Sequence, residues 1–124
     1  MPEITSLLHA GLLVADLARA KSFYESVLEL KPCPRPHLPY PGEWYDLGGG
    51  QQLHLMCLPN PDAGVVRPEH GGRDHHIALA VKDMTALKRR LDAAGVTYTA
   101  SRSGRAALFC RDPDENALEF VDPG

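Results

Sequence analysis

Four polar residues stand at matching places in the two halves of this chain of 124 residues, and all four have side chains that bind transition metals. They are His9, His54, His76 and Glu119. Three imidazoles and one carboxylate suit Zn, Ni, Co, Fe(II) or Mn, and the sequence does not choose among these ions. We therefore predict one divalent transition metal ion, with Gln52 as the alternative to His54.

The four residues belong to a duplicated segment. Residues 9–16 (HAGLLVAD) are echoed by residues 76–83 (HIALAVKD) at an offset of 67 positions. Residues 52–56 (QLHLM) parallel residues 117–121 (ALEFV) at an offset of 65 positions. Two nearly equal offsets indicate two copies of one structural module.

Each copy is expected to follow the order β-α-β-β-β. An alternating strand leads to Asp16 or Asp83, whose carboxylate can cap the helix that follows. Gly95 is expected to end the second helix. The later strands are predicted at residues 44–47 and 51–58 in the first copy, after an extended proline-rich loop at 32–41, and at residues 96–101, 105–111 and 117–121 in the second.

These elements predict an α+β fold in one domain. The first module is expected at about residues 4–60, a linker at about 61–73 and the second module at about 74–122. Because side chains alternate along a strand, the four polar residues all fall on the face turned away from the helices. A pseudo-twofold arrangement of the modules then brings the two pairs around one point.

Composition excludes several other classes of protein. The net charge is −3, the pI is about 6.0 and the basic residues are scattered, which argues against a nucleic-acid partner. No long apolar run or targeting segment is present, so we expect a cytoplasmic protein with no membrane partner. The three cysteines lie in no metal-binding or redox spacing and are expected to be core residues in a reducing compartment.

The chain resembles the vicinal oxygen chelate superfamily, which includes glyoxalase I, fosfomycin and bleomycin resistance proteins, extradiol dioxygenases and methylmalonyl-CoA epimerase. The resemblance covers nearly the whole chain, with its strongest signals in 20–24 (AKSFY), 76–81 (HIALAV) and 112–120, where DPD leads to LEF. It implies paired βαβββ modules that form a curled mixed sheet around a metal cleft. It also implies a homodimer whose modules complete the cleft.

The resemblance assigns metal ligands at positions 9, 54, 76 and 119, and it exposes three departures. Position 54 is commonly Glu or Gln in glyoxalases and epimerases, but here it is His54. A set with one carboxylate leaves a divalent centre with a net charge near +1, and it removes one candidate base. Glu29 and Glu115 stand where the family often has glycine, which puts the geometry of both turns in question.

By this resemblance the protein is an enzyme of glyoxalase type. Such a lyase or isomerase acts on a small molecule with neighbouring oxygens through a metal-stabilised enediolate, with Glu119 as the base. One alternative is an extradiol dioxygenase with Fe(II) on His9, His76 and Glu119. A second alternative is a bleomycin-resistance-like small-molecule binding protein, against which the ligand set argues.

Contacts to the substrate are predicted from residues near these strands. The candidates are Trp44, Met56, Arg105 and Phe109. Arg102 and Arg105 stand at a hairpin end, where pairing with an anionic substrate is an alternative to simple solvation. His75 is expected to point away from the site, and His37 and His70 are expected in loops.

Overall fold

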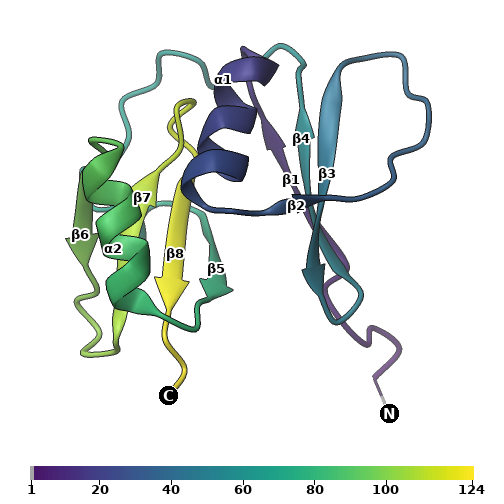
Figure 1. Cartoon of the computed structure of the whole chain (residues 1–124). Coiled ribbons are helices and arrows are strands. Elements are labelled where there is room, and N and C mark those ends of the chain that lie inside the picture. Colours follow the sequence, from purple (N-terminus) through teal and green to yellow (C-terminus); the bar gives the residue numbers. More distant parts are fainter. Residues whose placement is uncertain (1) are drawn as a thin grey trace.

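The two halves of the chain form two similar four-stranded sheets. The computed structural model describes residues 2–124. Strand orders are β1-β4-β3-β2 and β5-β8-β7-β6, and the two sheets stand side by side (Figure 1). The elements are β1 (His9–Leu13), α1 (Leu17–Lys21), the π-helix η1 (Ser22–Val27), β2 (Lys31–Pro32), β3 (Gly42–Gly48), β4 (Gln51–Met56), the 3-10 helix η2 (Gly71–Arg73), β5 (His76–Ala80), α2 (Met84–Ala93), β6 (Tyr98–Ala100), β7 (Ala107–Arg111) and β8 (Ala117–Val121).

The sheets have the same mixed topology. In each, the first strand runs parallel to the last, and the other neighbours are antiparallel. This confirms the predicted α+β class and the β-α-β-β-β order of both halves. Neither sheet closes into a barrel, so β1 and β5 are edge strands.

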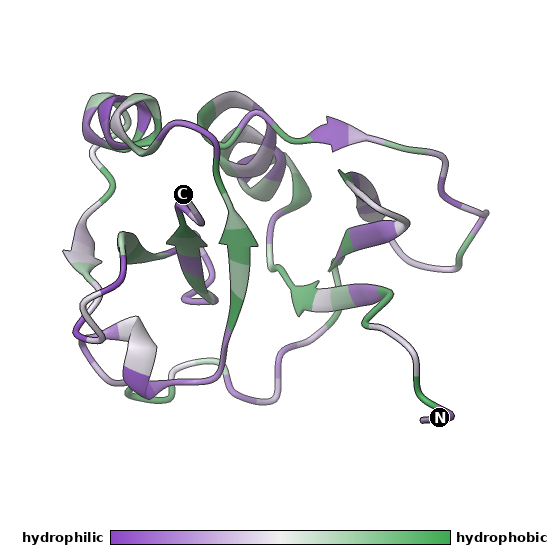
Figure 2. Cartoon of the chain, turned by 90° about the horizontal axis from the view of Figure 1, so that it is seen from below, coloured by the Kyte–Doolittle hydropathy of each residue, from purple (hydrophilic) through white to green (hydrophobic). Residues whose placement is uncertain are grey.

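The helices begin as predicted. The Asp16 carboxylate accepts a hydrogen bond from the amide of Arg19, and Asp83 accepts one from Ala86. Gly95 follows α2 with a φ of 71°, which suits a glycine cap. Figure 2 shows α1 and α2 side by side above the strands. No helix among residues 2–124 is both long enough and apolar enough to cross a membrane.

Two local features differ from the predictions. Lys31–Pro32 forms an edge strand paired with β3, although the segment from residue 32 was predicted as a loop. Proline is tolerated there because an edge strand needs no donor on its outer side. The first helix also continues as a π-helix, in which the amide of Leu28 donates to the carbonyl of Phe23. This wider turn accommodates two consecutive buried aromatic residues, Phe23 and Tyr24.

The core lies between the helices and the sheets. Strand alternation directs apolar side chains to this face, as predicted, and the ligand candidates occupy the other face. The most buried members from the strands and helices are Ala20, Tyr24, Tyr45, Leu53, Leu55, Leu87, Leu91, Leu108 and Leu118. This packing fixes the strand register, and the register fixes the position of each candidate ligand.

The turn at residues 112–116 joins the second half to the first. The Tyr24 hydroxyl donates to the buried Asp112 carboxylate at 2.6 Å. The Asn116 side chain donates to the carbonyl of Leu13, and the amide of Ala15 donates to the Asp114 carboxylate. These bonds hold the end of β1 against a turn about 100 residues later in the sequence.

Removal of the Tyr24 hydroxyl should destabilise the protein. Burial raises the pKa of Asp112, although hydrogen bonds from Tyr24 and Asn116 oppose that rise. Tyr24→Phe deprives the buried carboxylate of a donor and should lower the free energy of unfolding by about 1–3 kcal/mol at pH 7. Urea denaturation measures the change.

The destabilisation by Tyr24→Phe should depend on pH. Because the pKa of Asp112 is raised in the folded state, ionisation of this carboxyl costs stability as the pH rises from its unfolded to its folded pKa. Below that window the carboxyl is protonated, so loss of the donor should cost less at acidic pH than at pH 7. Tyr40→Phe is the matched control, and equal effects of the two variants would contradict this role for Tyr24.

Glu29 and Glu115 both adopt left-handed backbone conformations, with φ of 61° and 70°. This is the conformation for which glycine is suited, and it costs other residues about 1–2 kcal/mol. The Glu115 side chain is 70% exposed and lies 3.9 Å from Arg111, so its charge contributes little.

Glu115→Gly should therefore raise the free energy of unfolding by about 0.5–1 kcal/mol, after the greater freedom of glycine in the unfolded chain is deducted. Glu115→Ala removes the same charge but keeps a β-carbon. Thermal denaturation should show stabilisation by glycine alone, and a gain with alanine would point to the charge instead.

Candidate metal centre

The first pair of candidate ligands comes from β1 and β4. Gly11 is the register partner of His54, and the rings of His9 and His54 stack with centroids 4.2 Å apart. Trp44 of β3 stacks on His54 with centroids 3.8 Å apart. Burial, followed by the charges of His9 and Arg35, lowers the pKa of His54. His54 is thus kept neutral near pH 7, which is the form that binds metals.

Gln52 lies next to His54 and lines the same pocket. Its amide oxygen lies 2.8 Å from Nε2 of His54. Since an amide oxygen only accepts hydrogen bonds, this contact puts the ring proton on Nε2 and leaves the lone pair on Nδ1. The two candidates for this ligand position are therefore hydrogen-bonded to each other.

The second pair comes from β5 and β8, in the register that the duplication predicts. Ala78 is the register partner of Glu119, just as Gly11 is of His54. Nε2 of His76 lies 3.3 Å from one carboxylate oxygen of Glu119. The other oxygen accepts a hydrogen bond from Nη2 of Arg105 at 2.8 Å.

The second pair has the chemistry of a cation site. Nδ1 of His76 lies 2.9 Å from the carbonyl oxygen of Asp74. A carbonyl only accepts, so Nδ1 carries a proton, and a neutral ring then directs the lone pair of Nε2 toward the Glu119 carboxylate. Two facing acceptors repel unless a proton or metal ion lies between them. This arrangement, a backbone carbonyl that orients a histidine, is usual for metal ligands.

Asp74 is itself held firmly. Its carboxylate lies 2.9 Å from Nη1 of Arg111 and 3.3 Å from Nη1 of Arg67. Burial alone would raise its pKa, but hydrogen bonds from Arg111 and the amide of His75, together with the charge of Arg67, lower it below the ordinary value. The carbonyl that orients His76 thus belongs to an anchored residue.

A single chain gathers the predicted ligands as two pairs. Within residues 2–124, no group of three or more His, Cys, Asp or Glu side chains is placed to hold a metal ion. The set of four around one point therefore stays a prediction for the assembled protein.

Each pair lines a pocket of its own, and the predicted substrate contacts divide between these pockets. A pocket of about 480 Å³ holds the first pair with Trp44 and Met56. We call it the aromatic pocket. A pocket of about 360 Å³ holds the second pair with Arg105 and Phe109, and we call it the arginine pocket. The Phe109 ring stands edge-on to His76, with centroids 5.1 Å apart.

His70 lies in a loop, as predicted, and it is also buried in the wall of the arginine pocket, which was not predicted. Its Nδ1 lies 2.8 Å from the hydroxyl of Thr99, and its ring packs against Phe109. The signal in the sequence is the glycine pair that follows it. A β-carbon on Gly72 would come within 2.8 Å of the His70 ring. The His75 side chain, by contrast, is 78% exposed.

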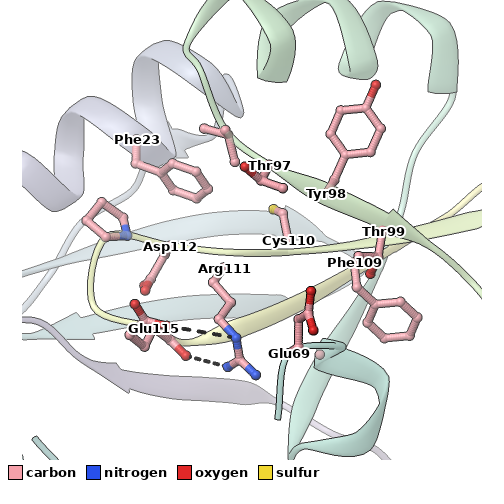
Figure 3. A pocket seen from close by; sticks show the side chains of 13 residues that line it. Phe23, Glu69, Thr97, Tyr98, Thr99, Phe109, Cys110, Arg111, Asp112 and Glu115 are labelled. Atoms are coloured by element: carbon pink, nitrogen blue, oxygen red, sulfur yellow. Dashed lines mark hydrogen bonds and ion pairs between the residues drawn. The ribbon is translucent and has the colours of Figure 1, made fainter. Parts of the chain in front are cut away.

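A third pocket, of about 390 Å³, lies beside Phe23, β6 and the end of β7 (Figure 3). Its arginine has a structural role, since Arg111 binds Asp74 and the carbonyl of Glu115. Burial raises the pKa of Cys110 to about 12, so its thiol stays protonated and is no nucleophile at neutral pH. None of the four predicted ligands lines this pocket.

Three related proteins match nearly the whole chain. Glyoxylase I 4 of Arabidopsis thaliana is 29% identical over 97% of this chain and 72% of its own length. Lactoylglutathione lyase of Haemophilus influenzae is 30% identical over 94% of this chain and 91% of its own length. Glutathione transferase FosA of Serratia marcescens is 29% identical over 94% of this chain and 80% of its own length.

Solved structures share the fold at lower identity. The fosfomycin resistance protein FosX of Listeria monocytogenes, in complex with Mn(II) and a dihydroxypropylphosphonic acid, aligns with a TM-score of 0.75 at 18% identity, over 98% of this chain and 94% of its own. TnmS3, an antibiotic binding protein of a Streptomyces species, aligns over the full length of both chains with a TM-score of 0.71 at 20% identity. A family model matches residues 6–120, and the chain belongs to the Glyoxalase/Bleomycin resistance protein/Dioxygenase superfamily.

Proposed function

We propose that this protein is a divalent-metal-dependent lyase or isomerase of glyoxalase type, acting on a small molecule with neighbouring oxygens. The observation that carries the proposal is the buried Glu119 carboxylate facing Nε2 of His76 at 3.3 Å. With Nδ1 committed to a carbonyl, a cation between these two atoms satisfies both. The relatives named as lyase and transferase support enzymatic activity.

His9, His54, His76 and Glu119 would hold the metal ion. A bound ion of this kind acts as a Lewis acid on the oxygens of a substrate. Glu119 is the only carboxylate of the set, so we assign it the removal of the proton beside the substrate carbonyl. The aromatic wall of Trp44 and the Phe109 ring would exclude water from the two sides of the site.

We further propose that the working protein is a homodimer. The pairs lie in separate pockets of one chain, and β1 and β5 are both edge strands. Leu7 and Leu8, just before β1, are 67% and 66% exposed, which is typical of a surface that a partner covers. In this arrangement His9 and His54 face the partner's His76 and the partner's Glu119.

The test of function has two parts. Elemental analysis and titration should find about one transition metal ion per site, and hydroxyacetone in D₂O should gain deuterium beside its carbonyl in the presence of the metal-loaded protein. Glu119→Gln should stop the exchange. Metal binding without exchange, together with oxygen uptake on a catechol, would favour the dioxygenase instead. Absence of both metal and exchange would favour a small-molecule binding protein.

A further inference from the structure

The arginine pocket concentrates positive charge in an acidic protein. Three arginines line it, namely Arg73, Arg102 and Arg105. The only carboxylate in its lining is Glu119, which Arg105 already binds. The chain as a whole has 16 acidic and 13 basic residues, so this local excess of cations runs against the overall charge.

Arg73 and Arg102 differ from most arginines of this protein. Arg19, Arg67, Arg90 and Arg111 each form an ion pair with a nearby carboxylate. Within residues 2–124, neither Arg73 nor Arg102 makes an ion pair or a side-chain hydrogen bond. Both residues line the arginine pocket and are exposed, so their guanidinium groups are accessible to a ligand.

The two arginines approach the pocket from different segments. Arg73 ends η2, and Arg102 lies in the loop between β6 and β7. Both act on the buried ring of His70, whose pKa is lowered by burial and then by the charges of Arg102, Arg73 and His76. The positive field of both side chains therefore meets at one place, beside the candidate ligands His76 and Glu119.

We propose that the arginine pocket is an oxyanion subsite in which Arg73 and Arg102 bind a carboxylate or phosphonate group of the substrate. This inference rests on the proposed function, because it places the anionic group next to the reacting oxygens. Arginine presents paired N–H groups that match both oxyanions, and charge-assisted bonds of this kind are strong. The natural substrate is then an oxygenated acid, and neutral hydroxyacetone reproduces only its reacting part.

Methylphosphonate and acetate are the probes, titrated separately into the metal-free protein and followed by amide chemical shifts. At low ionic strength, both should perturb the η2 segment and the loop at residues 101–105. Arg73→Gln and Arg102→Gln should each weaken binding by at least about threefold, and the double variant by more. Arg89→Gln, on the exposed face of α2, is the matched control.

The outcome separates the subsite from the metal centre. Equal binding by wild type, Arg89→Gln and the double variant, or no binding by wild type at millimolar probe, overturns the subsite. Stronger binding of methylphosphonate than of acetate identifies a phosphonate or phosphate as the source of the oxyanion, and the reverse identifies a carboxylate. Metal titration of the double variant should remain stoichiometric. If the wild-type protein binds no metal but the anion titrations give the expected results, only the proposed function is overturned.

Discussion

Glu119→Ala should abolish stoichiometric metal binding. Mutation of a residue that only orients a metal ligand typically lowers metal affinity by about 10- to 100-fold. Glu119 is itself a proposed ligand and the only carboxylate of the set. We therefore expect the metal affinity to fall by at least about a hundredfold. The carboxylate that faces Nε2 of His76 at 3.3 Å would be missing, so the pair would keep only one ligand. Competition with a chromophoric chelator measures the affinity for each ion.

His76→Ala should have an effect of similar size, because it removes the other half of the pair. Glu115→Gln is the control, since that carboxylate is exposed in the turn before β8. Circular dichroism checks that each variant keeps its fold. Full retention of metal by either Glu119→Ala or His76→Ala would refute the ligand set.

Two inactive variants should restore metal binding when mixed. One chain carries His9→Ala with His54→Ala, and the other carries His76→Ala with Glu119→Ala. If sites form between chains, a heterodimer holds one intact site and one site that lacks all four ligands. After unfolding together and refolding, random assortment should restore about a quarter of the wild-type metal per chain.

The mixing experiment distinguishes two arrangements of the same residues. If all four ligands come from one chain, neither variant can rescue the other and the mixture binds no metal. Separate refolding of each variant gives the baseline. Restoration near one quarter supports the shared site, and a mixture indistinguishable from the baseline contradicts it.

Much of the fold could be predicted because local chemistry and periodicity agree in both copies. Asp16 and Asp83 cap helices at equivalent places, and alternation along the strands predicted which side chains enter the core. The closing strand at residues 117–121 has the predicted bounds. Repetition strengthened each of these predictions, since a signal that occurs twice at one offset is rarely accidental.

The rest depended on contacts between distant segments. The edge strand at Lys31–Pro32 exists because β3 offers it a partner, which no local pattern reveals. His70 and Arg73 lie in a linker whose path over β7 and β8 is set by packing, so their places beside Glu119 could not be read from spacing. Whether the two pairs meet also depends on assembly, which a single chain does not determine.

The two pockets have diverged from a common module into unlike walls. One is aromatic, with Trp44 stacked on His54, and the other is cationic, with Arg105 on Glu119. A site made of identical halves would accept a substrate in two opposite orientations. Unlike walls admit one orientation, so a base on only one side reaches only one face of the carbon. We therefore expect the reaction to be stereospecific, with a single enantiomer consumed or formed.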